Sequence, residues 1–370
     1  MNQQAVEGAR NLLLNCANIR AGERVLILHE DPVLGWYDTA APMLVAQVAR
    51  ELGAVVEMRQ TGGPDNCFID GPADGSAEAK VHKAALIDAD CDCCIFFARI
   101  GDQLRFDQDI TGPRRVMSYI TSIEALASDY GRVEYQAMVA LKGAINRLLL
   151  NANTITLSCP LGSDLRGQVT TSKAEAPEDV TVSRFPAGVH APIDAAEFAG
   201  EIRLARYLTP TGSRVYAPAS INIGAPVTAQ VANGRIIKYL GQDGDVQHIQ
   251  HHYQQVAQQF SLDANALLSW HAGIHPGCRF FGEAADDPDR WSNTVFTNPR
   301  FAHFHTCGNE TPGEICWMVL DPTICIGDIP LWENGVLQLE QFSETRLCLE
   351  RWPSLRRLFD EANEEIGLLT

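Results

Sequence analysis

Short apolar runs alternate with amphipathic stretches along the first third of the chain. The predicted helices, in which apolar residues recur at helical spacing, cover residues 5–20, 43–52 and 77–88. The predicted strands are the apolar runs 24–29, 54–58, 92–98 and 116–119. Strands that are apolar throughout and separated by helices are typical of a parallel sheet with both faces covered. This pattern predicts a Rossmann-like α/β domain.

A dinucleotide-binding turn is missing from this domain. In Rossmann folds that bind dinucleotides, a Gly-x-Gly-x-x-Gly turn follows the first strand and lets the backbone approach the pyrophosphate. Here the first predicted strand leads into Glu30-Asp31-Pro32 instead. The sequence therefore predicts the fold without that cofactor.

The pattern of the chain changes after residue 150. A predicted helix over residues 133–150 ends the first part, and the later apolar segments are short, β-branched and separated by Gly and Pro. We therefore expect two domains. They are an N-terminal α/β domain over residues 1–150 and a C-terminal, β-rich α+β domain over residues 151–370.

Within the second domain, a hairpin and two helices stand out. Asn233-Gly234 lies between two strand-like runs and predicts a tight turn. Helical spacing covers residues 245–260 and 351–366. The first of these helices carries His248, His251 and His252, which we interpret as surface residues.

The composition and net charge of the chain limit the classes of molecule that it can bind. The chain of 370 residues has a formal net charge of −17 at pH 7, so nucleic acid and anionic membrane surfaces are excluded as main partners. The N-terminus lacks a basic region followed by an apolar run, and no apolar run is long enough to span a bilayer. We expect a cytoplasmic protein that takes a small-molecule substrate and forms a homodimer.

The number and spacing of the cysteines indicate a protein from a reducing compartment. There are eleven, an odd number without a regular framework, which indicates reduced thiols. Cys91, Cys93 and Cys94 form a Cys-x-Cys-Cys cluster, a pattern that can bind a soft metal. An apolar run follows directly, so we interpret these cysteines as buried strand thiols. Cys307 and Cys316 flank two histidines, which leaves a cysteine nucleophile open as an alternative.

Four of the ten histidines gather between residues 269 and 328. His271 and His275 lie on either side of a glycine, His303 and His305 are separated by one residue, and Asp321 follows an apolar run. On a strand, His303 and His305 share one face. Imidazole and carboxylate groups on neighbouring strands can bind a metal or exchange a proton near neutral pH. This region is the predicted site of chemistry.

Several short motifs follow one another in the second half of the chain. They are Gly162-Ser163-Asp164-Leu165, Pro186-Ala187-Gly188, Gly234-Arg235-Ile236, Gly273-Ile274-His275-Pro276 and Leu320-Asp321 with Asp328-Ile329-Pro330-Leu331. Together they resemble the motifs of the aminopeptidase T superfamily, which includes thermophilic metallopeptidases and 2,5-dihydroxypyridine 5,6-dioxygenases. The spacing of the last motif is similar to that of the dioxygenases. The resemblance covers about residues 150–340 and implies a C-terminal domain of aminopeptidase T type.

The resemblance also implies a metal centre. The dioxygenases hold one Fe(II) with two histidines and one aspartate, a facial triad that leaves positions open for substrate and oxygen. Asp321 matches the aspartate, whereas Val319 replaces one histidine and Ser269 the other. His271 lies two residues after Ser269, on the same face of a strand, and can substitute. The implied ligands of Fe(II) are His271, His303 or His305, and Asp321.

The predicted function is ring cleavage of a small cyclic substrate, such as a nitrogen heterocycle, by a mononuclear Fe(II) dioxygenase. In this interpretation His275, His303 and His305 bind substrate or transfer protons, and His190 is a candidate general base. Two alternatives stay open. One is a hydrolase on the same fold, with or without a metal, and the other is a binding protein without catalytic activity. A dinuclear peptidase site is disfavoured because Val189 replaces one of its glutamates.

Overall fold

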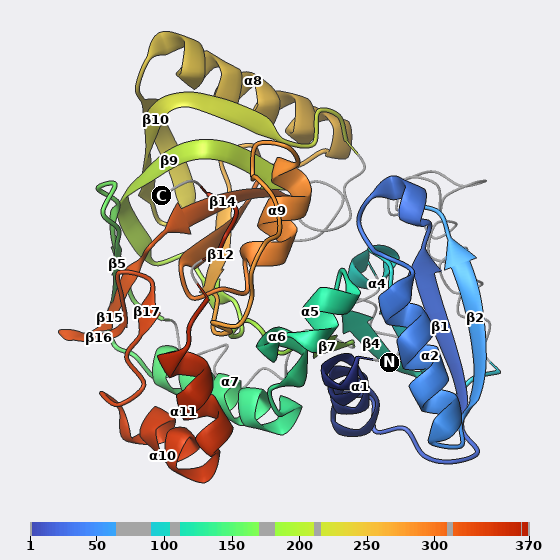
Figure 1. Ribbon diagram of the computed structural model, residues 1–370. Coiled ribbons are helices and arrows are strands. Elements are labelled where there is room, and N and C mark those ends of the chain that lie inside the picture. Colours follow the sequence, from blue (N-terminus) through green and yellow to red (C-terminus); the bar gives the residue numbers. More distant parts are fainter. Residues whose placement is uncertain are drawn as a thin grey trace. The chain divides into compact units, whose positions relative to one another are not determined.

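The computed structural model describes residues 2–63, 90–103, 112–169, 182–210, 216–308, 314–363 and 365–368 (Figure 1). The chain folds into two compact units. Unit 1 comprises Met1–Val139, Glu178–Gly188 and Arg357–Glu361. Unit 2 comprises Ala140–Pro177, Val189–Arg356 and Ala362–Thr370. Two segments that follow residue 150 in the chain belong to unit 1, and the domain boundary expected at residue 150 stays a prediction.

A five-stranded parallel sheet forms the centre of unit 1. Its strands are β1 (Arg24–Glu30), β2 (Val55–Thr61), β3 (Cys93–Phe97), β4 (Arg114–Ser118) and β7 (Ser183–Phe185). They are arranged in the order β2-β1-β3-β4-β7, and every pairing is parallel. The predicted parallel α/β sheet is confirmed. Strand β7 is too short to give a sequence signal, and its pairing with β4 explains why Glu178–Gly188 belongs to unit 1.

Helices precede and follow the strands of this sheet. They are α1 (Gln3–Arg10), α2 (Ala40–Glu51), α4 (Ile100–Gln103), α5 (Ile123–Ala127), α6 (Asp129–Arg132) and α7 (Tyr135–Leu150), the last of which continues into unit 2. A π-helical segment, Asn11–Cys16, extends α1, and a 3-10 turn covers Pro32–Leu34. The first helix ends earlier than predicted because Asn18 adopts a left-handed conformation, with φ of 54°. The helix predicted over residues 77–88 lies outside the described residues.

A buried ion pair joins the carboxyl ends of β1 and β3. Arg99 Nη2 lies 2.7 Å from Glu30 Oε1, and Arg99 Nε and its backbone N–H also donate to this carboxylate. The guanidinium carbon lies 4.1 Å from the ring centroid of Trp36. In a sheet with this strand order, the topological switch point lies between β1 and β3. The Arg99–Glu30 pair fills that position.

A twelve-stranded antiparallel sheet forms the centre of unit 2. Its strands are β5 (Ile155–Ser158), β6 (Asp164–Gly167), β8 (Ile193–Asp194), β9 (Phe198–Pro210), β10 (Ile221–Ala232), β11 (Arg235–Leu240), β12 (Leu267–Ala272), β13 (Phe301–Thr306), β14 (Ile315–Leu320), β15 (Thr323–Ile326), β16 (Ile329–Glu333) and β17 (Val336–Leu337). The main order is β17-β16-β15-β5-β6-β9-β14-β13-β12-β8, and β10 and β11 extend from β9. The predicted β-rich character of the second half is confirmed.

The predicted hairpin and the first predicted helix of this half are both present. Asn233 and Gly234 have φ of 52° and 66° and connect β10 to β11. Helix α8 (Asp243–Phe260) runs along β10 (Figure 1). His248 and His251 are exposed, as predicted, but His252 is buried because it lies on the face of α8 that also buries Ile249 and Tyr253.

The C-terminal helix is broken in two. Helix α10 (Ser343–Arg351) ends before Trp352, and α11 (Pro353–Asp360) begins at the next residue. Proline lacks an N–H group and disfavours the α conformation of the residue before it, so Trp352 is extended. The helix predicted over residues 351–366 is present in part, as α11, which begins two residues later than predicted and ends at Asp360.

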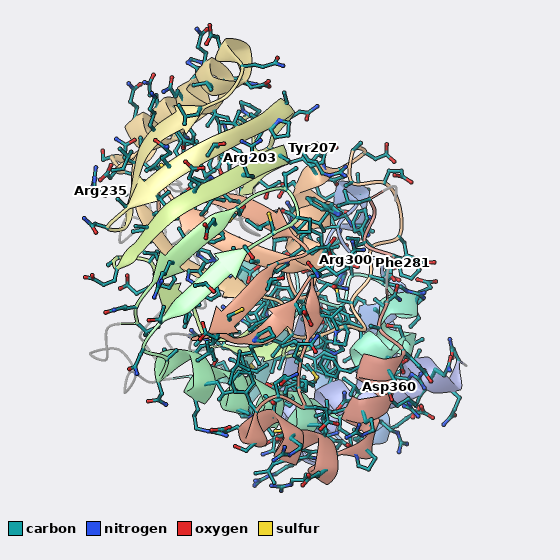
Figure 2. All side chains as sticks on the ribbon, turned by 90° about the vertical axis from the view of Figure 1, so that its left-hand side faces the viewer. Arg203, Tyr207, Arg235, Phe281, Arg300 and Asp360 are labelled. Carbon is teal, nitrogen blue, oxygen red and sulfur yellow. The ribbon has the colours of Figure 1, made fainter. Side chains whose placement is uncertain are left out.

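Helix α9 (Pro288–Val295) is held against the sheet of unit 2 by aromatic side chains. The ring centroids of Trp291 on α9 and Tyr207 on β9 are 5.8 Å apart. Figure 2 shows Tyr207 and Arg203 along the same strand. Trp291 Nε1 donates to Ile366 O at 2.7 Å, which ties the end of the chain to the same helix. The segment after α9 leads directly into β13.

The central strands of unit 2 carry aromatic residues on the face towards α8. Trp270 on β12 pairs with Phe304 on β13, and Phe304 pairs with Trp317 on β14. Trp317 Nε1 donates a hydrogen bond of 2.6 Å to the hydroxyl of Tyr253 on α8. Because successive side chains of a strand point to opposite faces, the histidines between these aromatic residues point to the other face.

Two further properties concern the described residues. No helix in the described part of the chain is long and apolar enough to cross a membrane. Their ten cysteines are free thiols. Cys93 and Cys94 are buried on β3, and burial raises the pKa of both, as expected for buried strand thiols. Cys91 lies before β3 and is only partly buried, so the prediction is wrong for this residue.

Candidate metal centre

The register of β12 and β13 brings three histidines onto one face of the sheet. His271 lies directly opposite His303, and Ser269 lies opposite His305. Residues 269 and 271, like 303 and 305, are two positions apart and therefore share a face. All four side chains are buried.

His271, His303 and His305 form one compact group. A ligand nitrogen of each ring lies within 4.8 Å of the others, and no other such group of three metal-binding side chains occurs among the described residues. The ring centroids of His303 are 4.7 Å from those of both His271 and His305. The arrangement offers imidazole nitrogens from two adjacent strands to one point.

The donor set fits a divalent transition metal. His271 Nε2 and His305 Nε2 are 3.0 Å apart. Two nitrogen ligands, each about 2.1 Å from one ion, lie about 3.0 Å apart when their bonds are roughly perpendicular. Imidazole suits Zn, Fe, Cu and Ni, whereas Mg and Ca prefer oxygen. The group is therefore a possible three-histidine metal site.

A buried carboxylate lies behind one of these rings. Glu314 Oε1 contacts His305 Nδ1, and the Glu314 side chain is 0% exposed. The contact leaves His305 Nε2 as the nitrogen that faces His271. Sequence reasoning missed Glu314. A charged residue at the start of an apolar strand resembles an ordinary strand end, but its position two residues before Cys316, the register partner of His305, places it on the histidine face.

Apolar and hydroxyl groups complete the surroundings. The Phe296 ring lies 6.1 Å from the ring of His271 and 5.9 Å from that of His303, measured between centroids. The buried Ser269 hydroxyl has no hydrogen-bond partner among the described residues. Gly273 follows His271 closely, and a Cβ atom there would lie 2.1 Å from the Asn298 carbonyl oxygen. The loop after β12 therefore packs tightly against the loop before β13.

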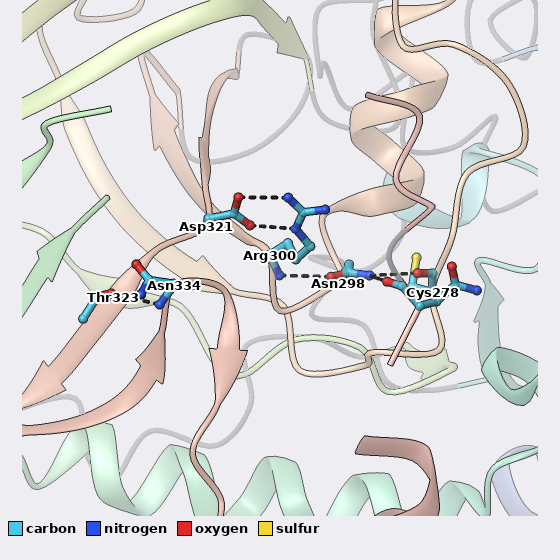
Figure 3. Close-up of polar contacts among 7 residues, drawn as sticks. Cys278, Asn298, Arg300, Asp321, Thr323 and Asn334 are labelled. Carbon is cyan, nitrogen blue, oxygen red and sulfur yellow. Dashed lines mark hydrogen bonds and ion pairs between the residues drawn. The ribbon is translucent and has the colours of Figure 1, made fainter. Parts of the chain in front are cut away.

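Asp321, the predicted carboxylate ligand, lies apart from the histidine group. Its two oxygens accept hydrogen bonds of 2.6 and 2.9 Å from Nε and Nη2 of Arg300 (Figure 3). Asp321 has a left-handed backbone, with φ of 50°, and its N–H donates to Arg300 O. This bidentate pair gives the carboxylate a partner other than a metal. Val319 pairs with Ala302, which places Val319 on the face opposite His303.

His190 is engaged through both ring nitrogens. Nδ1 lies 2.6 Å from Ala191 O, and Nε2 accepts a hydrogen bond of 2.8 Å from the N–H of Ala272. Burial lowers the pKa of His190 to about 4, although the Ala191 contact opposes this shift. A neutral ring with both nitrogens occupied has no lone pair for substrate. These contacts argue against the general-base role predicted for His190.

His275 is completely buried in the loop after β12. Its N–H donates to Thr297 O at 2.9 Å, and its carbonyl oxygen accepts from the N–H of Cys278. The structure does not place it in the histidine group. Its predicted contact with substrate stays a prediction.

A cysteine nucleophile is disfavoured beside this site. Burial raises the pKa of Cys307 to about 12, which keeps its thiol protonated. Cys316 is buried on β14, where it pairs with His305 across the sheet. Reactive cysteines require thiolate character and access, and Cys307 lacks the first.

Comparison with known proteins gives matches among solved structures. No protein-family model and no curated protein sequence matches the chain. The structure of 2,5-dihydroxypyridine dioxygenase from Pseudomonas putida KT2440 superposes with a TM-score of 0.60 at 14% identity, over 93% of this chain and 99% of that chain. The chain shares the fold of that dioxygenase.

A second solved structure is less similar. AmpT from Thermus thermophilus matches with a TM-score of 0.45 and 12% identity, over 91% of this chain and 100% of that chain. The first match, to the dioxygenase, agrees with the resemblance seen in the sequence motifs, which is confirmed at the level of fold.

Proposed function

We propose that this chain is a metal-dependent enzyme in which His271, His303 and His305 bind one divalent ion. The observation that carries the proposal is the convergence of these three buried rings from two adjacent strands. The fold shared with 2,5-dihydroxypyridine dioxygenase supports a small, cyclic, dihydroxypyridine-like substrate. The resemblance of the sequence motifs to this family implies Fe(II) as the ion. We place Asp321 outside the ligand set because Arg300 binds both of its oxygens.

The protein residues have separable tasks in this proposal. The three imidazole rings hold the ion, and Phe296 contacts the rings of His271 and His303 edge-on and provides an apolar side chain beside them. The Ser269 hydroxyl, on the same face, can donate a hydrogen bond to an oxygen of the substrate. Fe(II) with open positions would supply oxygen chemistry for cleavage of the ring.

A hydrolase is the second candidate, and the composition of the ligand set favours it. Three histidines without a carboxylate are a known catalytic zinc set, in which the metal lowers the pKa of bound water to about 7. The dioxygenase interpretation started instead from two histidines and one aspartate. The two candidates differ in the metal and in the need for oxygen.

Metal analysis of protein purified without oxygen tests the proposal. We expect close to one ion per chain in the wild type and loss of most of it in His271→Ala and His303→Ala. His248→Ala, on the exposed face of α8, is the matched control and should retain the ion. Iron together with oxygen uptake on dihydroxypyridines supports the dioxygenase, and zinc with oxygen-independent turnover supports the hydrolase. A wild type that binds neither iron nor zinc contradicts both.

A further inference from the structure

The carboxylate of Glu314 contacts the nitrogen of the His305 ring that does not face His271. Its Oε1 atom contacts Nδ1 of His305, whereas Nε2 of the same ring faces His271 at 3.0 Å. The two imidazole nitrogens are separated by one ring carbon and bond in different directions, so one ring connects the carboxylate to the histidine group.

The backbone around Glu314 is held from two sides. Its carbonyl oxygen accepts a hydrogen bond of 2.8 Å from the hydroxyl of the buried Tyr216. The next residue, Ile315, begins β14, and its carbonyl oxygen accepts from Thr306 Oγ1 at 2.8 Å. Because Thr306 follows His305 in the chain, these two hydrogen bonds fix the backbone of Glu314 relative to that of His305.

Burial makes this carboxylate costly unless positive charge compensates it. A fully buried carboxylate destabilises the folded chain when it is not paired. A neutral imidazole supplies one N–H donor. An imidazole whose other nitrogen binds a divalent cation supplies the same donor together with positive charge, and the carboxylate in return fixes the tautomer and raises the basicity of the ligand.

We propose that Glu314 is a positioning residue of the metal centre, which orients His305 and raises the affinity of the three histidines for a divalent cation. This inference rests on the proposed function and goes beyond it, since Glu314 does not itself bind the ion. It predicts that removal of one buried negative charge weakens metal binding, although all three ligands remain.

The affinity of the full chain for Zn(II) and Co(II), measured by competition with a chromophoric chelator, tests this. Glu314→Gln keeps the shape of the side chain and removes its charge. Asp321→Asn is the matched control, because it removes an equal charge from the same unit at the Arg300 pair. We expect Glu314→Gln to bind Zn(II) about 10–100-fold more weakly. Asp321→Asn should bind it like the wild type.

A spectroscopic readout separates positioning from general destabilisation. The visible spectrum of bound Co(II) should change in Glu314→Gln, because His305 is no longer held in one orientation, and should stay unchanged in Asp321→Asn. Circular dichroism establishes that each variant is folded. If Glu314→Gln does not fold, Glu314→Asp takes its place, since a shortened carboxylate should also lower the affinity.

The outcomes distinguish the inference from the proposed function. A wild type that binds neither ion overturns the proposed function. A wild type that binds the ions, with equal affinity in the Glu314 variant, overturns the inference and leaves the three-histidine centre in place. Equal weakening in the Glu314 and Asp321 variants also overturns it, because the effect then follows net charge and not the contact with His305.

Discussion

At the scale of single residues, a buried histidine outside the candidate metal centre makes the free energy of unfolding depend on pH. Burial lowers the pKa of His252 to about 4 from the ordinary 6.5, and the nearby His248 and His251 lower it further. Between these values the unfolded chain binds a proton that the folded chain does not. Stability is therefore lost as the pH falls from about 6.5 to 4.

The expected size of this effect is measurable. Between pH 7 and pH 5 the linkage contributes about 2 kcal/mol, or roughly 4–8 °C in the Tm of a domain of this size. His252→Gln should reduce the fall in Tm over this range by that amount. His251→Gln, at an exposed position of the same helix, should leave the fall nearly intact. Equal slopes in the wild type and His252→Gln contradict the prediction.

Single residues of the site were predictable to different degrees. His271, His303 and His305 could be found because alternation along a strand shows which side chains share a face. Glu314 could not, since its contact with His305 depends on the register of a hairpin. The ion pair between Asp321 and Arg300 was not predictable either, because it joins two strand ends that only the folded sheet brings together.

At the scale of elements, the buried ion pair between the ends of β1 and β3 should control the stability of unit 1. Removal of one partner leaves an uncompensated charge in the interior, which typically costs about 3–5 kcal/mol. We expect Arg99→Met or Glu30→Gln to lower the free energy of unfolding by this amount. Urea denaturation of the variants measures it.

A double variant and an exposed pair control this experiment. Glu30→Leu combined with Arg99→Met should cost less than Arg99→Met alone, because no charge is then left unpaired. Arg235→Met, which breaks the exposed pair with Asp263, should cost less than about 1 kcal/mol. If Arg99→Met costs no more than Arg235→Met, the buried pair is not important for unit 1.

Elements with a strong local pattern were predicted well. The strands β1 to β4 each overlap one of the predicted apolar runs, and the β10–β11 hairpin follows from Asn233-Gly234 alone. Two elements were predicted less well, the C-terminal helix and β7. The helix predicted over residues 351–366 begins only at Pro353, because a proline disfavours the α conformation of the residue before it, and β7 is a strand only because β4 offers it an edge.

At the scale of the whole molecule, the two units should respond differently to metal. An ion bound by His271, His303 and His305 stabilises unit 2, by about 2.7 kcal/mol at a free concentration one hundred times the Kd. Unit 1 contains none of these ligands. In calorimetry of the metal-loaded and metal-free chain, we expect one transition to move and the other to stay.

Variants identify the two transitions in this experiment. Arg99→Met should lower the transition of unit 1, since its ion pair lies there. His303→Ala should abolish the shift caused by metal. A shift of the unit 1 transition in the wild type, or a shift that persists in His303→Ala, contradicts the assignment of the ion to this site.

The sequence supports the fold class of the molecule better than its division into units. Alternating helices and strands indicate the parallel sheet, and short β-branched segments indicate the second, β-rich part. Two later segments also belong to unit 1, Glu178–Gly188 and Arg357–Glu361. No local sequence pattern predicts this, because it depends on contacts between residues far apart in the chain. The expected homodimer stays a prediction.

The burial of the three histidines also affects when a metal can arrive. His271, His303 and His305 are 4%, 6% and 6% exposed, so an ion from solvent reaches their nitrogens only when neighbouring side chains move aside. Such openings of a folded sheet are rare events. Exchange is then limited by the protein and not by diffusion of the ion. The metal found in a preparation would record the ions present while the chain was folding, more than those in the final buffer.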